Sequence, residues 1–239
     1  MRREPPTPED AAPRHEETDP LVAEALSWYR RGVFPMADLD RRIPGGPAEV
    51  YLYDPPERGI IPLEDGGLRV SKSLRQRVRS GRFRVSSDEA FGCVIAECGD
   101  PDREGAWIDP QVRAIYTHLH AAGVAHSVEV WRTDDVGTEH LVGGLYGVAV
   151  DGLFAGESMF SRPDLGGTDA SKVALVHLWH HLRSRGFVLL DCQFQTPHLA
   201  RLGCVEVSRE DYHERLRDAK AVQPTWGDFN HATARMELA

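Results

Sequence analysis

The sequence of 239 residues lacks the short motifs of several common enzyme classes. It contains no G-x-x-x-x-G-K-[ST] and no G-x-G-x-x-G, so nucleoside triphosphate and dinucleotide sites have no support. It also lacks G-x-S-x-G, which disfavours the serine nucleophile of an α/β-hydrolase. His177 and His181 are spaced i, i+4, but the glutamate of an HExxH motif is missing. We therefore expect no metal site, and we interpret these histidines as a solvated helix face.

Long apolar runs and paired cysteines are absent as well. No stretch approaches the roughly 20 apolar residues of a membrane span, and the N-terminus has no apolar run typical of a secretory signal. The four cysteines, Cys93, Cys98, Cys192 and Cys204, form no CxxC pair. This spacing argues against a zinc ribbon and suits a reducing compartment. We therefore expect a cytoplasmic protein without a membrane segment.

The charge is uneven along the chain. The net charge is −9, yet residues 69–84 hold seven basic residues and no acid. Such a stripe can bind phosphates even on an acidic protein, because nearby charges dominate under screening; the alternative is a solvated helix face. Residues 1–20 hold six acids, three bases and several prolines, a composition that predicts a disordered tail.

Apolar periodicity predicts an α+β fold. A helix begins at Leu21 and ends at Gly32, and 21–68 is interpreted as a small N-terminal domain. Asp109 and Pro110 open a second helix. Residues 126–132, 140–150 and 152–160 alternate as antiparallel strands, and a long helix follows over 168–186. A catalytic domain over 69–222 and a C-terminal tail over 223–239 complete the expected organisation.

Three polar residues interrupt apolar strands. Asp191 and Gln193 end the strand that begins at Phe187, and their spacing of two places them on one side of an extended strand. A buried carboxylate needs a partner, so a catalytic role is one reading; the other is that Asp191 caps a turn and Gln193 faces water. Glu157 follows Gly156 in a Met-containing apolar strand, which suits a pocket beside it. The alternative is a strand glutamate facing solvent.

Several separate stretches resemble one family, the bacterial leucyl/phenylalanyl-tRNA–protein transferases. Together they cover roughly residues 28 to 215, and their order and spacing match the family pattern. They are "YRRGVFPM" (29–36), "AFGCVIAEC" (90–98), "WIDPQV" (107–112), "AHSVEVWR" (125–132), "LVGGLYGVA" (141–149), "GESMFSR" (156–162), "ASK" (170–172), "LDCQ" (190–193) and "LGCVEVSREDY" (202–212).

The resemblance implies a monomeric cytosolic enzyme of the N-degron route, without metal or cofactor. It would move Leu or Phe from aminoacyl-tRNA to proteins that begin with Arg or Lys. The family pairs a small N-terminal domain with a GNAT-like acyltransferase domain, whose mixed sheet is largely antiparallel. Its catalytic positions map onto Asp191 and Gln193, and its position for the basic acceptor residue maps onto Glu157, where a carboxylate is the physical expectation.

The resemblance also implies binding positions for the donor tRNA. Trp107 and Met36 would contact the terminal adenosine, although many relatives have tryptophan at the second position. Arg75, Arg77 and Arg79 would contact the tRNA backbone by charge. The family positions for the aminoacyl pocket fall on six apolar residues: Leu145, Met159, Leu175, Leu178, Leu182 and Leu190.

Two other functions remain open from the sequence. An acyl-CoA-dependent N-acyltransferase of GNAT type should carry a glycine-rich turn for the pyrophosphate at a helix N-terminus. The nearest stretch, "RPDLGGTDAS" (162–171), has the wrong spacing. A non-catalytic tRNA-binding protein is the second alternative, and the intact set of Glu157, Asp191 and Gln193 speaks against it.

Overall fold

The chain is described by a computed structural model over residues 19–38, 49–102, 107–230, 234 and 238. The predicted disordered tail over 1–20 lies outside these residues, except for Asp19 and Pro20. Asp19 caps the first helix, because its side chain accepts hydrogen bonds from the backbone N–H groups of Leu21 and Val22.

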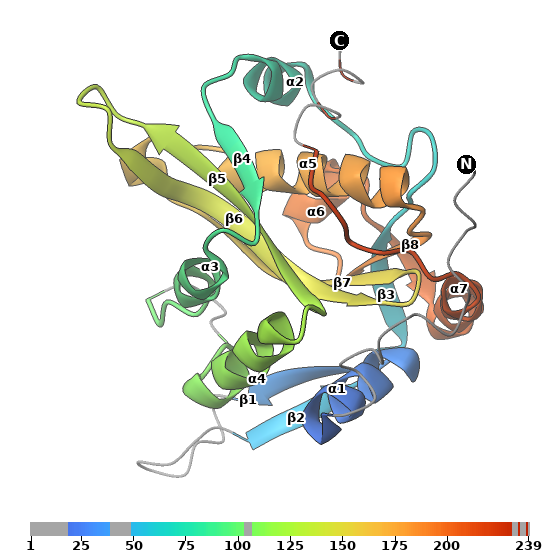
Figure 1. The fold of residues 1–239 in the computed structure, drawn as a ribbon. Coiled ribbons are helices and arrows are strands. Elements are labelled where there is room, and N and C mark those ends of the chain that lie inside the picture. The colour runs from blue at the N-terminus through green and yellow to red at the C-terminus, as the bar shows by residue number, and fades with distance from the viewer. Residues whose placement is uncertain (1–18, 39–48, 103–106, 231–233, 235–237, 239) are drawn as a thin grey trace, which may run out of the picture.

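A seven-stranded sheet forms the centre of the described fold (Figure 1). One pair of neighbours, β7 and β8, is parallel, and the other neighbours are antiparallel. This is the mixed, largely antiparallel sheet that the sequence predicted. In spatial order the strands are β4 (Arg84–Ser87), β5 (Ala125–Thr133), β6 (Glu139–Val150), β7 (Leu153–Ser161), β8 (Leu189–Gln193), β3 (Glu57–Ile61) and β9 (Val205–Ser208).

Helices cover both faces of this sheet (Figure 1), and an apolar core lies on each face. One core includes residues of α1 (Pro20–Arg30), α3 (Phe91–Cys98), α4 (Pro110–Ala121) and α7 (Arg209–Lys220). The other includes residues of α2 (Lys72–Arg79) and α5 (Ala170–Arg185). The remaining elements are α6 (Pro197–Arg201), the 3-10 turn η4 (Pro163–Leu165) and the hairpin of β1 (Phe34–Asp38) with β2 (Glu49–Tyr53).

The helix ends follow the capping residues in the sequence. Asp109 accepts a hydrogen bond from the backbone N–H of Val112 at 2.8 Å, and Pro110 occupies the first helical position. Gly186 ends α5 with φ of +85°, a conformation that glycine adopts without steric cost. These local signals explain why the predicted helices are found close to their expected bounds.

The predicted split at residue 68 is not confirmed. Strand β3 comes from the range that was assigned to the N-terminal domain, yet it lies inside the large sheet between β8 and β9. The main sheet therefore incorporates a strand from early in the chain.

The histidines of α5 are buried, which corrects the expectation of a solvated face. His177, His180 and His181 are each at most 5% exposed. The ring of His181 packs against Trp226 and Phe229, with centroids 4.5 and 4.8 Å away. Burial lowers the pKa of His181 to about 4, so it stays neutral at pH 7. These two aromatic residues belong to the predicted C-terminal tail, and they lie against the core.

The described residues contain no group of three or more His, Cys, Asp or Glu side chains placed to hold a metal ion. No helix in the same part of the chain is long and apolar enough to cross a membrane.

Candidate active site

Strand β8 contains a bulge at the predicted catalytic residues. Against β3, Asp191 pairs with Ile60 and Gln193 pairs with Gly59, so Cys192 is the extra residue. Gln193 has φ of +63°, in the left-handed region that non-glycine residues rarely adopt. A Cβ on Gly59 would lie 2.8 Å from backbone atoms of Phe194 and Gln195, so only glycine fits opposite this bend.

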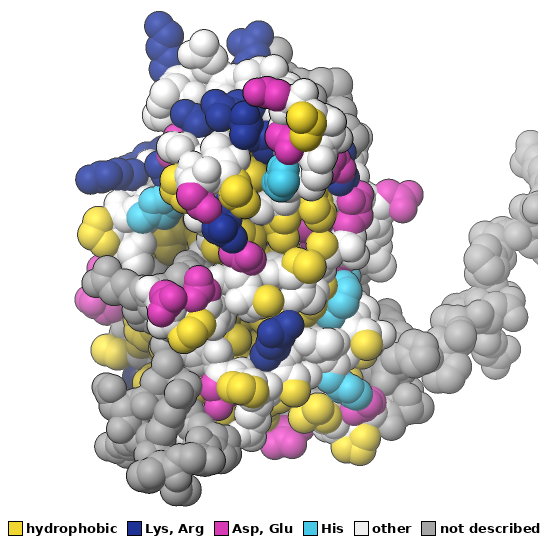
Figure 2. Space-filling model, turned by 90° about the vertical axis from the view of Figure 1, so that its left-hand side faces the viewer, with side chains coloured by type: hydrophobic (Ala, Val, Ile, Leu, Met, Phe, Trp, Pro, Cys, Tyr) yellow, Lys and Arg dark blue, Asp and Glu magenta, His cyan; other side chains and the backbone are white. Residues whose placement is uncertain are grey.

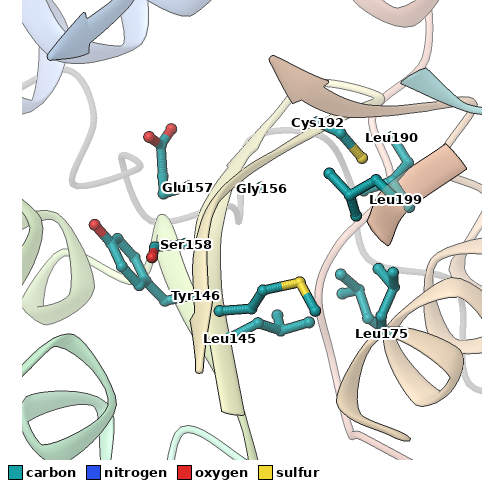
Figure 3. Close-up of a pocket in the computed structure, with 11 residues that line it drawn as sticks. Leu145, Tyr146, Gly156, Glu157, Ser158, Leu175, Leu190, Cys192 and Leu199 are labelled. Atoms are coloured by element: carbon teal, nitrogen blue, oxygen red, sulfur yellow. The ribbon is translucent and has the colours of Figure 1, made fainter. Parts of the chain in front are cut away.

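Strand β7 has a second bulge, at Glu157. Tyr146 on β6 pairs with Ser158 and Gly147 pairs with Gly156, which leaves Glu157 without a strand partner. The bulge turns the Glu157 side chain away from the apolar cavity residues, toward the side where Tyr146 lies (Figure 3). Two bulges on neighbouring strands thus direct the polar side chains of the site.

Asp191 is fully buried in an ion pair with Arg58, which the sequence analysis did not identify. The Arg58 Nε lies 2.9 Å from Asp191 Oδ1, and Nη2 lies 2.6 Å from Oδ2. The Tyr212 hydroxyl donates to Oδ2 at 3.0 Å, and the backbone N–H of Gln193 donates to Oδ1 at 2.7 Å. Each carboxylate oxygen therefore already accepts at least two hydrogen bonds.

Arg58 is itself held firmly. Its guanidinium carbon lies 4.4 Å from the ring centroids of both Phe34 and Tyr212, a cation–π arrangement on two sides. Its Nη1 donates to the carbonyl oxygen of Gly32 at 2.8 Å. Segments near residues 32, 58, 191 and 212 thus meet around one guanidinium group.

Glu157 is buried with neutral partners. The Tyr29 hydroxyl donates to Glu157 Oε1 at 2.7 Å, and Gln193 Nε2 donates to Oε2 at 2.8 Å. The hydroxyls of Tyr29 and Tyr116 lie 2.9 Å apart. Within the described chain no salt bridge involves Glu157. Burial raises its pKa to about 7, and the hydrogen bonds from Tyr29, Tyr116 and Gln193 offset only part of that rise.

An apolar cavity of about 90 Å³ opens beside these hydrogen-bonded polar residues, between β7 and β8 (Figure 3). On β7, the parallel pairing with β8 extends from Leu153 to Ala155. The cavity lining on this strand begins at the next residue, Gly156, just beyond the paired segment. Five of the six predicted pocket residues line it: Leu145, Met159, Leu175, Leu178 and Leu190. Leu182 does not line it; this residue is completely buried in the core beside α5.

Sequence reasoning missed several residues of this region. Cys192 and Leu199 line the cavity, and Tyr146 lies at its polar end. The Tyr146 hydroxyl is buried and has no hydrogen-bond partner among the described residues, an arrangement that is rare in folded proteins. Simple alternation places Cys192 on the side of β8 opposite to Asp191, beside Leu190, so the signal for this residue was present in the sequence.

The predicted adenosine residues lie on the same face of the sheet as Tyr29 and Tyr116. Trp107 packs edge-on against Tyr116, with centroids 6.5 Å apart. Met36 lies on β1, and both side chains are partly buried against the same core. Binding of the terminal adenosine by these two residues stays a prediction.

The predicted tRNA-backbone residues do not share one face of α2. Arg75 and Arg79 are exposed, and Lys and Arg side chains gather at the end of the molecule where α2 lies (Figure 2). Arg77 points to the segment before α5, where Nη1 donates to the carbonyl oxygen of Thr168 at 2.7 Å and Nη2 lies 3.4 Å from Asp169. Residues two apart on a helix lie on different faces, whereas residues spaced i, i+3 and i+7 lie on the same face. Lys72 therefore lies on the same face of α2 as Arg75 and Arg79.

Comparison with known proteins gives consistent matches over most of the chain. A family profile described as "Leucyl/phenylalanyl-tRNA protein transferase" matches residues 60–217. The leucyl/phenylalanyl-tRNA–protein transferase of Paramagnetospirillum magneticum is 47% identical over 226 residues, covering 92% of this chain and 98% of the relative. The proteins of the same name from Hyphomonas neptunium and Caulobacter vibrioides are 48% and 46% identical, covering 83% and 87% of this chain and 72% and 88% of those relatives.

These matches make the chain an aminoacyltransferase. It belongs to the leucyl/phenylalanyl-tRNA–protein transferase family.

Proposed function

We propose that the protein transfers leucine or phenylalanine from aminoacyl-tRNA to the α-amine of proteins that begin with Arg or Lys, and so marks them for degradation in the cytosol. The observation that carries this proposal is a series of hydrogen bonds beside an apolar cavity. These hydrogen bonds link Gln193 to both Asp191 and Glu157. The mixed sheet with one parallel pair is also consistent with a GNAT-like catalytic domain, and we propose that the enzyme acts as a monomer.

The cavity suits the side chain of the aminoacyl group. Its lining is mostly leucine and methionine, and the polar residues Tyr146 and Glu157 lie at one end. An apolar side chain buried there would place its ester carbonyl toward Gln193.

Gln193 is the residue best placed to receive the attacking amine. In its ionised form Glu157 only accepts hydrogen bonds, so the contact with that form fixes the Gln193 nitrogen on that side. The Gln193 Oε1 is left to accept from the acceptor's amine. The amine nitrogen would attack the ester carbonyl, the bond to the ribose oxygen would break, and the amine proton would end on that oxygen.

Asp191 acts in this proposal as a positioning residue. Its two oxygens already accept hydrogen bonds from Arg58, Tyr212 and the Gln193 backbone. Its contact with Gln193 is through the backbone N–H, which supports the left-handed bend at that residue. Orientation of the reacting groups is itself a large source of rate enhancement.

Glu157 supplies negative charge for the first residue of the acceptor. A guanidinium or ammonium group that approached it would replace neutral donors with a charge-assisted hydrogen bond. Its pKa of about 7 means that binding a cation and losing a proton are linked at this residue.

The test is transfer of labelled leucine from Leu-tRNA to a peptide that begins with Arg. We expect transfer by the wild type, at least a hundredfold slower transfer by Asp191→Ala, and unchanged transfer by Asp218→Ala, a carboxylate on α7. A peptide that begins with Ala tests the acceptor preference, and an N-acetylated Arg peptide tests the requirement for a free amine. Equal transfer to the Arg and Ala peptides would contradict the assignment of the acceptor.

A further inference from the structure

A second cavity, of about 150 Å³, lies between α2, α5 and α6. Its volume is many times the roughly 10–15 Å³ that one water needs, so it accommodates a group of several heavy atoms. Cations and hydroxyls dominate its lining. The lining residues are Arg69, Ser71, Ser73, Leu74, Asp169, Lys172, His198, Arg201 and Leu202.

The charge of this cavity is positive on an acidic protein. Its lining contains three cations, Arg69, Lys172 and Arg201, and one carboxylate, Asp169. That carboxylate is shared, because Lys172 Nζ lies 2.6 Å from Oδ1 and Arg77 Nη2 lies 3.4 Å from Oδ2. The single acid therefore leaves uncompensated positive charge around the cavity.

The two serines add neutral donors at the start of α2. Ser71 caps the helix by accepting from the backbone N–H of Leu74, and its hydroxyl lies 3.1 Å from that of Ser73. Burial and the neighbouring Lys172 lower the pKa of His198, so this histidine is a neutral hydrogen-bonding group at pH 7. Hydroxyls, an imidazole and cations are together the groups that bind phosphate oxygens.

The cavity adjoins the predicted aminoacyl pocket. Lys172 is three residues before Leu175 on α5, about 4.5 Å along the helix axis, and Leu175 lines the apolar cavity. His198 directly precedes Leu199, which also lines the apolar cavity. The same two helices thus form a common wall between a cationic cavity and an apolar one.

We propose that this cavity binds a backbone phosphate of the donor tRNA while the aminoacyl group occupies the apolar cavity. Lys172, Arg201 and Arg69 are the phosphate contacts, and the exposed cations of α2, Lys72, Arg75 and Arg79, continue the path for the backbone. The inference rests on the proposed function for the identity of the nucleic acid. It adds a phosphate site formed by α5 and α6, and it removes Arg77 from the residues that contact tRNA directly.

The test is the affinity of the full-length protein for deacylated tRNA over a range of salt concentrations. Lys172→Gln, Arg201→Gln and Arg69→Gln should each weaken binding about tenfold, the low end for a hydrogen bond to a charged group. Each should also reduce the slope of log K against log salt by about 0.7–0.9, the change for one lost phosphate contact. Arg217→Gln on α7, which removes a cation 66% exposed, is the matched control.

A second readout separates phosphate binding from damage to the neighbouring pocket. The variants transfer leucine from Leu-tRNA and from leucyl-adenosine, a donor without a backbone phosphate. The proposal expects the ratio of tRNA-dependent to adenosine-dependent transfer to fall about tenfold, matching the loss of affinity, and Lys172→Arg to restore much of it. Equal losses with both donors would overturn the phosphate assignment.

Two other results would overturn the inference. One is tRNA affinity and salt slope in all three variants equal to those of Arg217→Gln. The other combines two observations: inorganic phosphate stabilises the wild type but not Lys172→Gln, and the two proteins bind tRNA with equal affinity. This result would indicate a site for a free anion. Wild-type transfer to the Arg peptide is measured on the same preparation, so failure of the proposed function is seen separately.

Discussion

Asp191 and Glu157 are both buried carboxylates, and Gln193 contacts both, yet their surroundings differ. Asp191 is paired with a guanidinium group and also accepts from a tyrosine and a backbone N–H. Glu157 has tyrosine and amide donors, with no ion pair in the described part of the chain. The difference separates a carboxylate fixed in an ion pair from a buried carboxylate whose pKa lies at about 7.

The largest effect should come from removing the cation at Asp191. Arg58→Met leaves a fully buried carboxylate without its counter-ion, which should lower the free energy of unfolding by about 3–5 kcal/mol. Urea unfolding at pH 7 measures this, and leucine transfer should fall with it.

The control for Arg58 is a surface pair. Arg217→Met breaks an exposed pair with Glu214 at 3.5 Å and should change stability by about 0–1 kcal/mol. Similar losses for the two variants would show that the Arg58–Asp191 pair is not an essential contact.

The next effect is a pH dependence specific to Glu157. Its pKa is raised from 4.5 to about 7 in the folded protein, so the folded state binds more protons than the unfolded state between these values. Stability from this group is therefore present below pH 4.5 and is lost as the pH rises through 7. The difference in unfolding free energy, Glu157→Gln minus wild type, should grow on the order of 3 kcal/mol from pH 4.5 to 8.

Acceptor binding should reveal the same titration. For an Arg peptide, protonation of the peptide's own α-amine, with a pKa of roughly 7.7–8.0, lowers kcat/KM in any variant. Protonation of Glu157 should add a further limb in the wild type, an additional fall of about tenfold per unit of pH below 7. The Glu157→Gln profile should lack that limb, although its transfer is slower throughout. Parallel profiles for the two proteins would assign the titration to another group.

Smaller losses of stability are expected from removing the tyrosine hydroxyl that donates to each carboxylate. Tyr29→Phe removes a donor from Glu157 and leaves the Tyr116 hydroxyl without that partner. It should cost about 1–3 kcal/mol and move the pH midpoint of transfer upward, because the ionised form loses a hydrogen bond. Unfolding and pH–rate curves measure the two quantities.

The smallest effect is expected from Tyr212→Phe. Asp191 keeps its contacts with Arg58 and the Gln193 backbone, so the cost should be about 1 kcal/mol, without a shift in the pH midpoint. A midpoint shift as large as that of Tyr29→Phe would mean that the two carboxylates titrate together.

The helices α1, α4 and α5 were predictable because their signals are local. Asp109, Pro110 and Gly186 act within one helical turn of their own positions. The identities of Asp191, Gln193 and Glu157 came from family resemblance added to such patterns. The six pocket positions were also close to the observed lining, with Leu182 as the exception.

The contacts of the site were not predictable in the same way. A bulge depends on the register of two strands, and nothing in the local sequence around Glu157 or Cys192 specifies the partner strand. Arg58 lies in a loop-rich segment whose pattern does not indicate pairing with Asp191. The buried histidines of α5 were misread because the Trp226 segment that covers one of them is distant in sequence.

The position of β3 has a consequence for synthesis of the protein. Arg58 and Asp191 are separated by 133 residues, and β3 pairs with strands that leave the ribosome last. Residues 57–61 must therefore wait, unpaired, until most of the chain has been made, and such distant pairing is slow to form. A nascent or C-terminally truncated chain that ends before β8 cannot assemble the site, so activity first appears in an almost complete molecule.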